Sequence, residues 1–144
     1  MDSSGAQILQ NIVATLRSTE EFALVTLGKT DSATSVPRAH VLYEGQEILT
    51  ADDTYSARWM RLKVGILIHS RAKNGPAGVV RATELSTLAL EALLEDRFRA
   101  ANCCDLPVGE ATELSGIEFP TCIRRPEIET ILKLRCHFEI SGVQ

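Results

Sequence analysis

The chain has 144 residues, the size of one domain, and its 44% apolar and 24% charged residues are typical of a folded globular protein and not of a disordered one. Fifteen Lys and Arg oppose 19 Asp and Glu, so a net charge of −4 offers no long-range attraction to nucleic acid or anionic lipid. No apolar run approaches the ~20 residues that cross a bilayer, and residues 1–4 lack the pattern of a secretion signal. We therefore expect one soluble domain over residues 1–144, without a nucleic-acid or membrane partner.

The first half of the chain predicts one helix and then three strands. Ser4 to Gln7 has the Ser-x-x-Gln form of a capping box, and apolar residues at helical spacing follow as far as Leu16, so we expect a helix from Ser4 to Arg17 or Ser18. The strand formers of 22–27 predict a first strand. Residues 38–44 predict a second strand that pairs with the first, and an extension of it over 48–49 is left open. The third strand, 59–69, alternates strictly, and its expected core row is Met60, Leu62, Val64, Ile66 and Ile68.

The second half predicts a long helix and then two strands. Pro76 suits the first turn of a helix that we expect over 77–99. The side chains expected to cover the sheet are Val80, Leu85, Leu88, Ala89, Ala92, Leu93 and Phe98, and those expected to face water are Glu91, Glu95, Asp96, Arg97 and Arg99. Residues 111–119 predict a weaker strand in which Gly116 marks a bulge. The last strand carries the row Ile128, Thr130, Leu132, Leu134, Cys136, Phe138 and Ile140 on its core face.

These elements predict an α+β fold. The expected order is α-β-β-β-α-β-β, with a mainly antiparallel sheet of about five strands and two main helices packed on one face. No repeat or long polar linker divides the chain.

No arrangement of residues typical of catalysis or metal binding occurs in the sequence. His40, His69 and His137 all fall on predicted strands without a second ligand at metal-binding spacing, and the four cysteines form no Cys-x-x-Cys pair. We expect the cysteines to be reduced and the histidines to be structural. The sequence therefore predicts no enzyme activity, no cofactor and no metal.

The polar faces of the two long strands are the one unusual surface feature. One strand carries Trp59, Arg61 and Lys63, and the other carries Glu127, Glu129, Lys133, Arg135 and Glu139. Two interpretations remain open: a solvated sheet face with cross-strand ion pairs, or an interface between subunits.

The element order, the length and the residue pattern resemble the tail terminator proteins of long-tailed bacteriophages, including the lambda-like phages. The resemblance rests on the helix with Ile8-Leu9 and Ile12-Val13, the strand 58–68, the helix that contains 88–94, and the closing strand 131–140. It spans nearly the whole chain.

This resemblance implies a structural virion protein without enzyme activity. A ring, usually of six copies, would cap the tail tube, stop its polymerisation and offer the head a joining surface. The implied partners are other copies of the chain, the tail tube protein and a head-completion or connector protein. The protein would assemble in the host cytoplasm and lie at the head-proximal end of the tail. We place the subunit or tube interface on Trp59, Arg61, Lys63, Arg124, Arg125, Glu127, Glu129, Lys133 and Arg135.

Two alternatives belong beside this interpretation. One is a head–tail adaptor or other tail-completion protein of the same virion. The other is a small ligand-binding or enzymatic α+β domain, with a pocket between the long helix and the sheet and His69 or His137 as its polar group.

Overall fold

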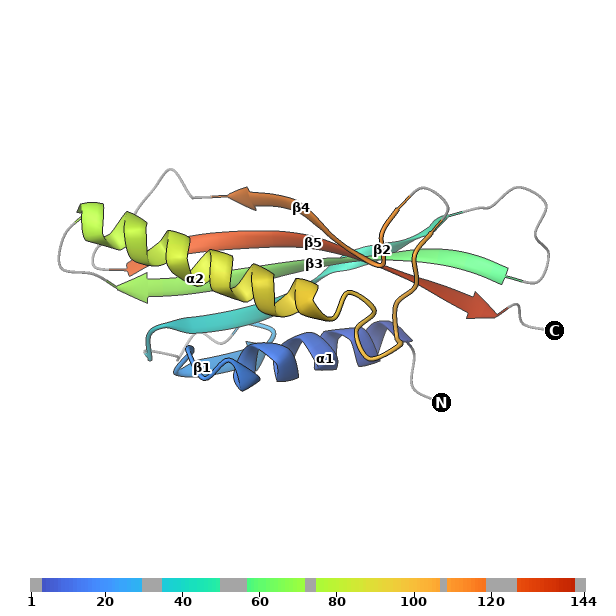
Figure 1. Ribbon diagram of the computed structural model, residues 1–144, viewed down its shortest axis with the longest axis horizontal. Coiled ribbons are helices and arrows are strands. Elements are labelled where there is room, and N and C mark those ends of the chain that lie inside the picture. The colour runs from blue at the N-terminus through green and yellow to red at the C-terminus, as the bar shows by residue number, and fades with distance from the viewer. Residues whose placement is uncertain are drawn as a thin grey trace.

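The computed structural model describes residues 4–29, 35–49, 57–71, 75–106, 109–118 and 127–141, and it confirms the predicted α+β fold (Figure 1). The element order is α-β-β-β-α-β-β. The elements are α1 (Ser4–Ser18), β1 (Leu24–Leu27), β2 (Arg38–Leu49), β3 (Ala57–Arg71), α2 (Gly75–Glu95), β4 (Thr112–Glu118) and β5 (Glu127–Ser141).

The five strands form one sheet in the order β1-β2-β3-β5-β4. The expected pairing of the first two strands is confirmed, and β1 runs parallel to β2, an arrangement that a tight hairpin cannot connect. All other neighbours are antiparallel. The register of β4 against β5 shifts between Leu114 and Gly116, which confirms the predicted bulge at this glycine.

Both helices lie on the same face of the sheet (Figure 1), and the core fills the space between them. The predicted core row of β3 is buried along its whole length, and so is that of β5 from Ile128 to Phe138, while Ile140 at the end of β5 is 41% exposed. From the helices, the core receives Ile8, Ile12, Leu16, Leu85, Ala89 and Leu93. Each fully buried aliphatic side chain contributes about 1.5–3 kcal/mol to folding, so these two rows hold the fold together.

The buried face of α2 differs from the prediction at two positions. Val80 is 57% exposed and Phe98 is 39% exposed, whereas Ala82 is fully buried. Val80 lies roughly 140° around the helix from Leu85, away from the stripe that contacts the sheet. Phe98 follows the last helical residue, Glu95, so helical periodicity no longer positions it.

Arg99 is the largest departure from the sequence prediction, because it is fully buried and not exposed to water. Its guanidinium donates hydrogen bonds to the carbonyl oxygens of Leu93 and Asp96, the latter also from Nε at 2.8 Å, and Nη1 lies 3.4 Å from Thr15 Oγ1 on α1. The last carbonyls of a helix lack intrahelical donors and carry partial negative charge, so a buried cation is stabilised there.

The backbone after α2 turns sharply to bring Arg99 back under the helix end. Arg99, Ala100 and Ala101 have φ values of 48°, 55° and 67°, three successive residues in the left-handed region. Burial lowers the pKa of the Arg99 guanidinium, but an arginine starts so high that it keeps its charge. The buried charge therefore joins the end of α2 to α1.

Replacing Arg99 is expected to destabilise the protein through this helix end. Arg99→Met leaves carbonyls of α2 without donors and should lower the free energy of unfolding by about 2–4 kcal/mol. Arg99→Lys keeps the charge but has fewer hydrogen-bond donors, so its free energy of unfolding should lie between those of the wild type and Arg99→Met. Urea denaturation measures the effect, with the exposed Arg97→Met as control at no more than about 1 kcal/mol. Equal losses for Arg97→Met and Arg99→Met would contradict the capping role.

Candidate interaction surface

The outer sheet face, opposite α1 and α2, collects most of the side chains assigned to the interface from the sequence. Because β3 and β5 are neighbours, Lys63 faces Arg135 and Gly65 faces Lys133 across the strands. Trp59, Arg61 and Glu129 lie on the same face by strand alternation. Glu127 is paired with Arg71 by backbone register. Arg124 and Arg125 lie outside the described residues.

The basic side chains of β3 already have an acidic partner within the chain. Arg61 Nη1 lies 3.2 Å from Glu47 Oε1 on β2, and Lys63 Nζ lies 3.8 Å from the same oxygen. The hydrogen bond from Arg61 is the main reason that the pKa of Glu47 is lowered. Sequence reasoning missed Glu47, because only the sheet order shows that β2 borders β3 on this side.

A second ion pair crosses β3 over a glycine. Glu44 lies where the register of β2 shifts against β3, and its Oε2 approaches Lys133 Nζ on β5 to 3.9 Å. A Cβ at Gly65 would lie 2.6 Å from Glu44 Oε1, so only a residue without a side chain lets this carboxylate lie across the strand. Lys133 also lies 4.0 Å from Glu118 of β4.

Cations outnumber carboxylates among the residues that line a hollow of about 280 Å³ on this face, while Glu47 and Glu118 lie beside Lys63 and Lys133. Its lining residues are Glu44, Lys63, Ser115, Lys133, Leu134 and Arg135. Within the described part of the chain, Arg135 forms no ion pair, since its register partner Glu113 instead accepts a hydrogen bond from the backbone N–H of Glu110 at 2.7 Å. Arg135 is thus an exposed cation directly opposite Lys63, and like charges in this position repel.

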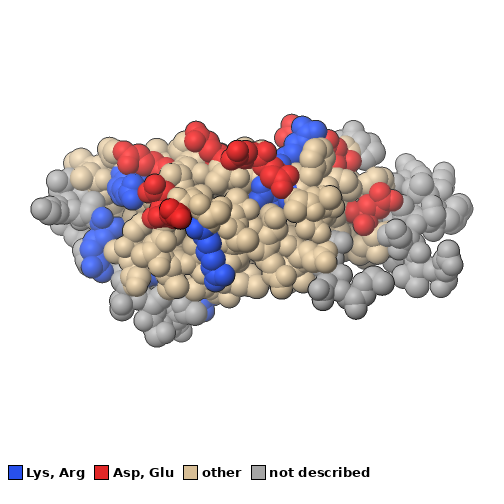
Figure 2. Space-filling view, turned by 60° about the horizontal axis from the view of Figure 1, so that its bottom comes forward, with Lys and Arg blue, Asp and Glu red and all other residues tan. Residues whose placement is uncertain are grey.

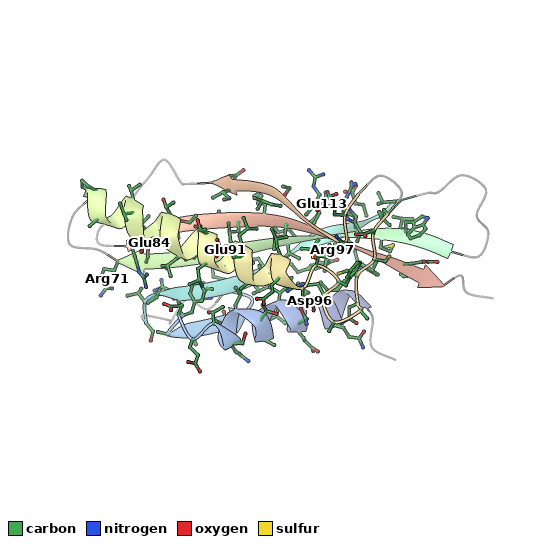
Figure 3. All side chains as sticks on the ribbon, in the orientation of Figure 1. Arg71, Glu84, Glu91, Asp96, Arg97 and Glu113 are labelled. Atoms are coloured by element: carbon green, nitrogen blue, oxygen red, sulfur yellow. The ribbon has the colours of Figure 1, made fainter. Side chains whose placement is uncertain are left out.

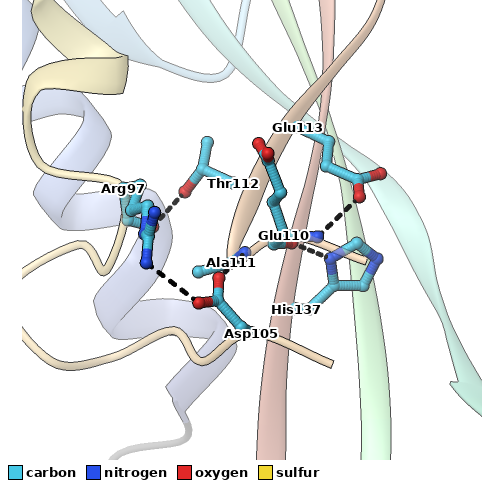
Figure 4. Close-up of polar contacts among 7 residues, drawn as sticks. All are labelled: Arg97, Asp105, Glu110, Ala111, Thr112, Glu113 and His137. Atoms are coloured by element: carbon cyan, nitrogen blue, oxygen red, sulfur yellow. Dashed lines mark hydrogen bonds and ion pairs between the residues drawn. The ribbon is translucent and has the colours of Figure 1, made fainter. Parts of the chain in front are cut away.

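His137 also points to the outer face, but it is fully buried and has a structural role. Arg61 Nε donates to His137 Nε2 at 3.1 Å, so the ring proton is on Nδ1, which donates to the Glu110 carbonyl at 2.5 Å (Figure 4). The hydrogen bond from His137 therefore attaches the segment that precedes β4 to strand β5.

The same segment is held by a second set of polar contacts around Asp105 (Figure 4). One carboxylate oxygen of Asp105 lies 3.0 Å from Arg97 Nη2, and the other accepts the backbone N–H of Ala111 at 2.8 Å. Thr112 Oγ1 donates to the Arg97 carbonyl at 2.6 Å. These bonds tie the chain that follows α2 to the start of β4.

His40 and His69 form a second buried polar group on the outer face. Their ring centroids are 5.7 Å apart, with the rings nearly perpendicular. The Thr26 hydroxyl donates its one proton to the Gly28 carbonyl at 2.7 Å, so it accepts from His40 Nδ1 at 2.6 Å. His69 Nε2 lies 3.5 Å from Glu129. Burial, followed by the nearby charges of His69, Arg38 and Lys29, lowers the pKa of His40.

The structure does not place His69 or His137 in the alternative ligand pocket between α2 and the sheet, to which the sequence analysis assigned them. His69 pairs with Arg38 on β2, and His137 pairs with Arg61 on β3, so both rings lie on the face away from α2. The sequence placed both on strands correctly. It did not show which side of the sheet the helices cover.

The structure offers no metal-ligand cluster within the described residues, where no group of three or more His, Cys, Asp or Glu side chains converges. Cys103, Cys104 and Cys136 carry free thiols, and Cys122 lies outside the described residues. Cys103 and Cys136 are buried and share a side-chain hydrogen bond, which with burial raises the pKa of the Cys103 thiol. These thiols are part of the core.

A scan of the chain against protein-family models finds no match, and a search among curated proteins finds none. Among the described residues, no helix is long and apolar enough to span a membrane.

The close approach of Glu44 to Gly65 predicts a change of sign in a double-mutant cycle. In a Glu44→Ala background, Gly65→Ala should stabilise the protein by about 0.5–1 kcal/mol, because alanine loses less backbone entropy than glycine on folding. With Glu44 present, the same substitution should be neutral or destabilising, because the carboxylate must leave Lys133. Urea denaturation of the four proteins gives the coupling. Equal effects of Gly65→Ala in both backgrounds would contradict the contact.

The lowered pKa of His40 predicts a loss of stability in mild acid. When the pH falls below the ordinary value of 6.5, His40 is protonated in the unfolded chain before it is protonated in the folded chain. The free energy of unfolding therefore decreases as the pH decreases. Urea denaturation between about pH 7.5 and about pH 5.5 should show a shallower fall for His40→Gln than for the wild type. Lys29→Gln removes the smallest of the charges that lower this pKa, so it should change the slope less than His40→Gln does. Identical pH slopes for wild type and His40→Gln would contradict the assignment.

Proposed function

We propose that this chain is a structural virion protein, a bacteriophage tail terminator. In this role, copies form a ring, most simply of six, that caps the tail tube, stops tube polymerisation and presents a surface for head joining. Its partners are its own copies, the tail tube protein and a head-completion or connector protein. It acts at the head-proximal end of the tail after assembly in the host cytoplasm, with no enzymatic step.

One observation carries this proposal: the helices leave one face of a sheet with two long strands uncovered, and that face is charged. β3 and β5 each extend over 15 residues, about three times the usual 5–6, and both helices pack on a single face. The opposite face holds the hollow lined by Lys63, Lys133 and Arg135. Such a broad charged surface on a small domain supports an assembly role, as does the element order that resembles tail terminators.

A head–tail adaptor of the same virion is the second candidate, because the same surface also suits a connector. Binding preference separates the two. A terminator binds the open end of a tail tube, whereas an adaptor binds only the portal side of the head.

The test is electron microscopy of the purified protein mixed with polymerising tail tube protein. We expect ring-shaped caps at one end of each tube, and tubes that stop growing when the protein is added. Tubes without the protein are the control for length.

Tubes that bear no caps and grow to the same lengths with and without the protein would overturn the tail-terminator proposal. Binding to filled heads in the absence of tails would favour the adaptor. Turnover of a small molecule at a site that His69 or His137 contributes would favour the enzyme alternative.

A further inference from the structure

Two surfaces of opposite charge lie on opposite faces of this chain. The basic hollow consists of Lys63, Lys133 and Arg135 on the outer sheet face. The acidic ridge consists of Glu84, Glu91, Glu95 and Asp96, on α2 and in the turn after it. Both helices cover the inner face of the sheet (Figure 1), and the hollow is on the outer face, so the ridge on α2 and the hollow lie on opposite sides of the sheet.

The acidic ridge is exposed and follows the C-terminal half of α2, from Glu84 onward. Glu84, Glu91 and Asp96 lie along the helix and just beyond it in Figure 3, and Figure 2 shows acidic side chains gathered along the upper rim of the helix-covered side. Glu84 has a local partner, Arg81, at 3.7 Å, and Asp96 accepts the Ala100 N–H at 2.8 Å. Glu91 and Glu95 form no ion pair with another described residue.

The position of Glu91 and Glu95 is unfavourable within one copy. The C-terminal end of a helix carries partial negative charge, and the last turn of α2 contains no basic residue. The buried Arg99 offsets the partial negative charge of the helix carbonyls that it binds, but it forms no ion pair with the exposed carboxylates of Glu91 and Glu95. A cationic surface laid over this end of α2 would remove the repulsion.

The basic hollow has the converse property. Lys63 and Arg135 face each other directly across β3 and β5, and like charges opposite each other destabilise a sheet. Glu47 approaches Lys63 only to 3.8 Å, and no carboxylate of the described residues forms an ion pair with Arg135, which Glu47 and the register partner Glu113 attract from a longer distance. An acidic surface laid over the hollow would stabilise this pair.

We propose that copies of this chain associate head to tail, with the acidic ridge of one copy seated on the basic hollow of the next. The spacing matches, because Glu91 and Glu95 are one helical turn apart, ~6 Å, and side chains opposite each other on neighbouring strands are about 5 Å apart. The partner is a second copy because the chain itself presents both surfaces. Such an interface is heterologous, and it closes into a ring when the rotation between copies permits.

This inference deepens the proposed function, on which only the closure into a ring rests. It adds α2 to the interface that the sequence placed on the outer sheet face alone.

Complementary charge reversal tests the interface by analytical ultracentrifugation. We expect the wild type to associate, with weaker association at about 0.5 M salt than at about 0.05 M salt, because the charges are screened. Lys63→Glu/Arg135→Glu and Glu91→Lys/Glu95→Lys should each weaken self-association at least about tenfold.

Mixing the two reversed proteins should restore association, because each surface then finds its opposite on the other protein. The fourfold variant with both surfaces reversed should also associate alone, and it has the net charge of the wild type, which excludes a general charge effect. Glu20→Lys/Glu21→Lys, which changes the net charge as the ridge variant does but lies before β1, is the control and should associate normally. Circular dichroism melting confirms that each variant is folded.

The proposal is overturned if the wild type stays monomeric at low salt, if the two double variants associate as the wild type does, or if mixing restores nothing. The outcome is distinguishable from that of the proposed function. A chain that associates in this pattern but leaves tube length unchanged overturns the tail-terminator role alone. A chain that caps tubes while charge reversal leaves its mass unchanged overturns this interface alone.

Discussion

The in-register pairing of β3 with β5 is the constraint on which the rest of the structure depends. Their paired residues run from Ala57 against Ser141 to Arg71 against Glu127 without interruption. Since side chains alternate along a strand, this pairing creates one continuous apolar surface and one mainly polar surface, which Leu67 and Ile131 interrupt. The apolar surface can be removed from water only by the two helices, and both therefore pack on the same side. The charged side of the sheet is therefore the side that the helices do not cover.

Periodicity explains which parts of the fold the sequence predicts. The rows of β3 and β5 and the stripe of α1 repeat strictly, so the buried residues follow from the pattern alone. Periodicity says nothing about a residue beyond the end of an element. Arg99 is buried because its side chain donates to the carbonyls at the end of α2, in a turn that begins with its own left-handed backbone, whereas a charged residue after a helix ordinarily faces water. The parallel direction of β1 likewise depends on the path of the chain and not on local pattern.

The candidate surface was predictable in composition but not in pairing. Alternation places each of these side chains on the polar face of its own strand, and the pairing of β3 with β5 joins the two polar faces into one. The side chains are Trp59, Arg61, Lys63, Glu129, Lys133 and Arg135. The partners came from elsewhere: Glu47 and Glu44 belong to β2, and the latter reaches β5 only because Gly65 leaves room. His137 shows the reverse case. It belongs to the polar row by sequence, yet the segment around Glu110 covers it and makes it structural.

The distribution of ion pairs on the outer face decides which of its charges are available to a partner. Arg61 is committed twice, to Glu47 and to the buried ring of His137, so it serves the fold first. Lys133 is shared between Glu44 and Glu118 at the outer limit of an ion pair. Arg135 lies between Lys63 on β3 and Glu113 on β4, and it forms no ion pair among the described residues. Exposed ion pairs contribute little to folding, so the fold gains little stability from placing Arg135 beside Lys63. Their cost within one copy, together with the carboxylates of Glu91 and Glu95 that form no ion pair among the described residues, is the reason for proposing the head-to-tail contact.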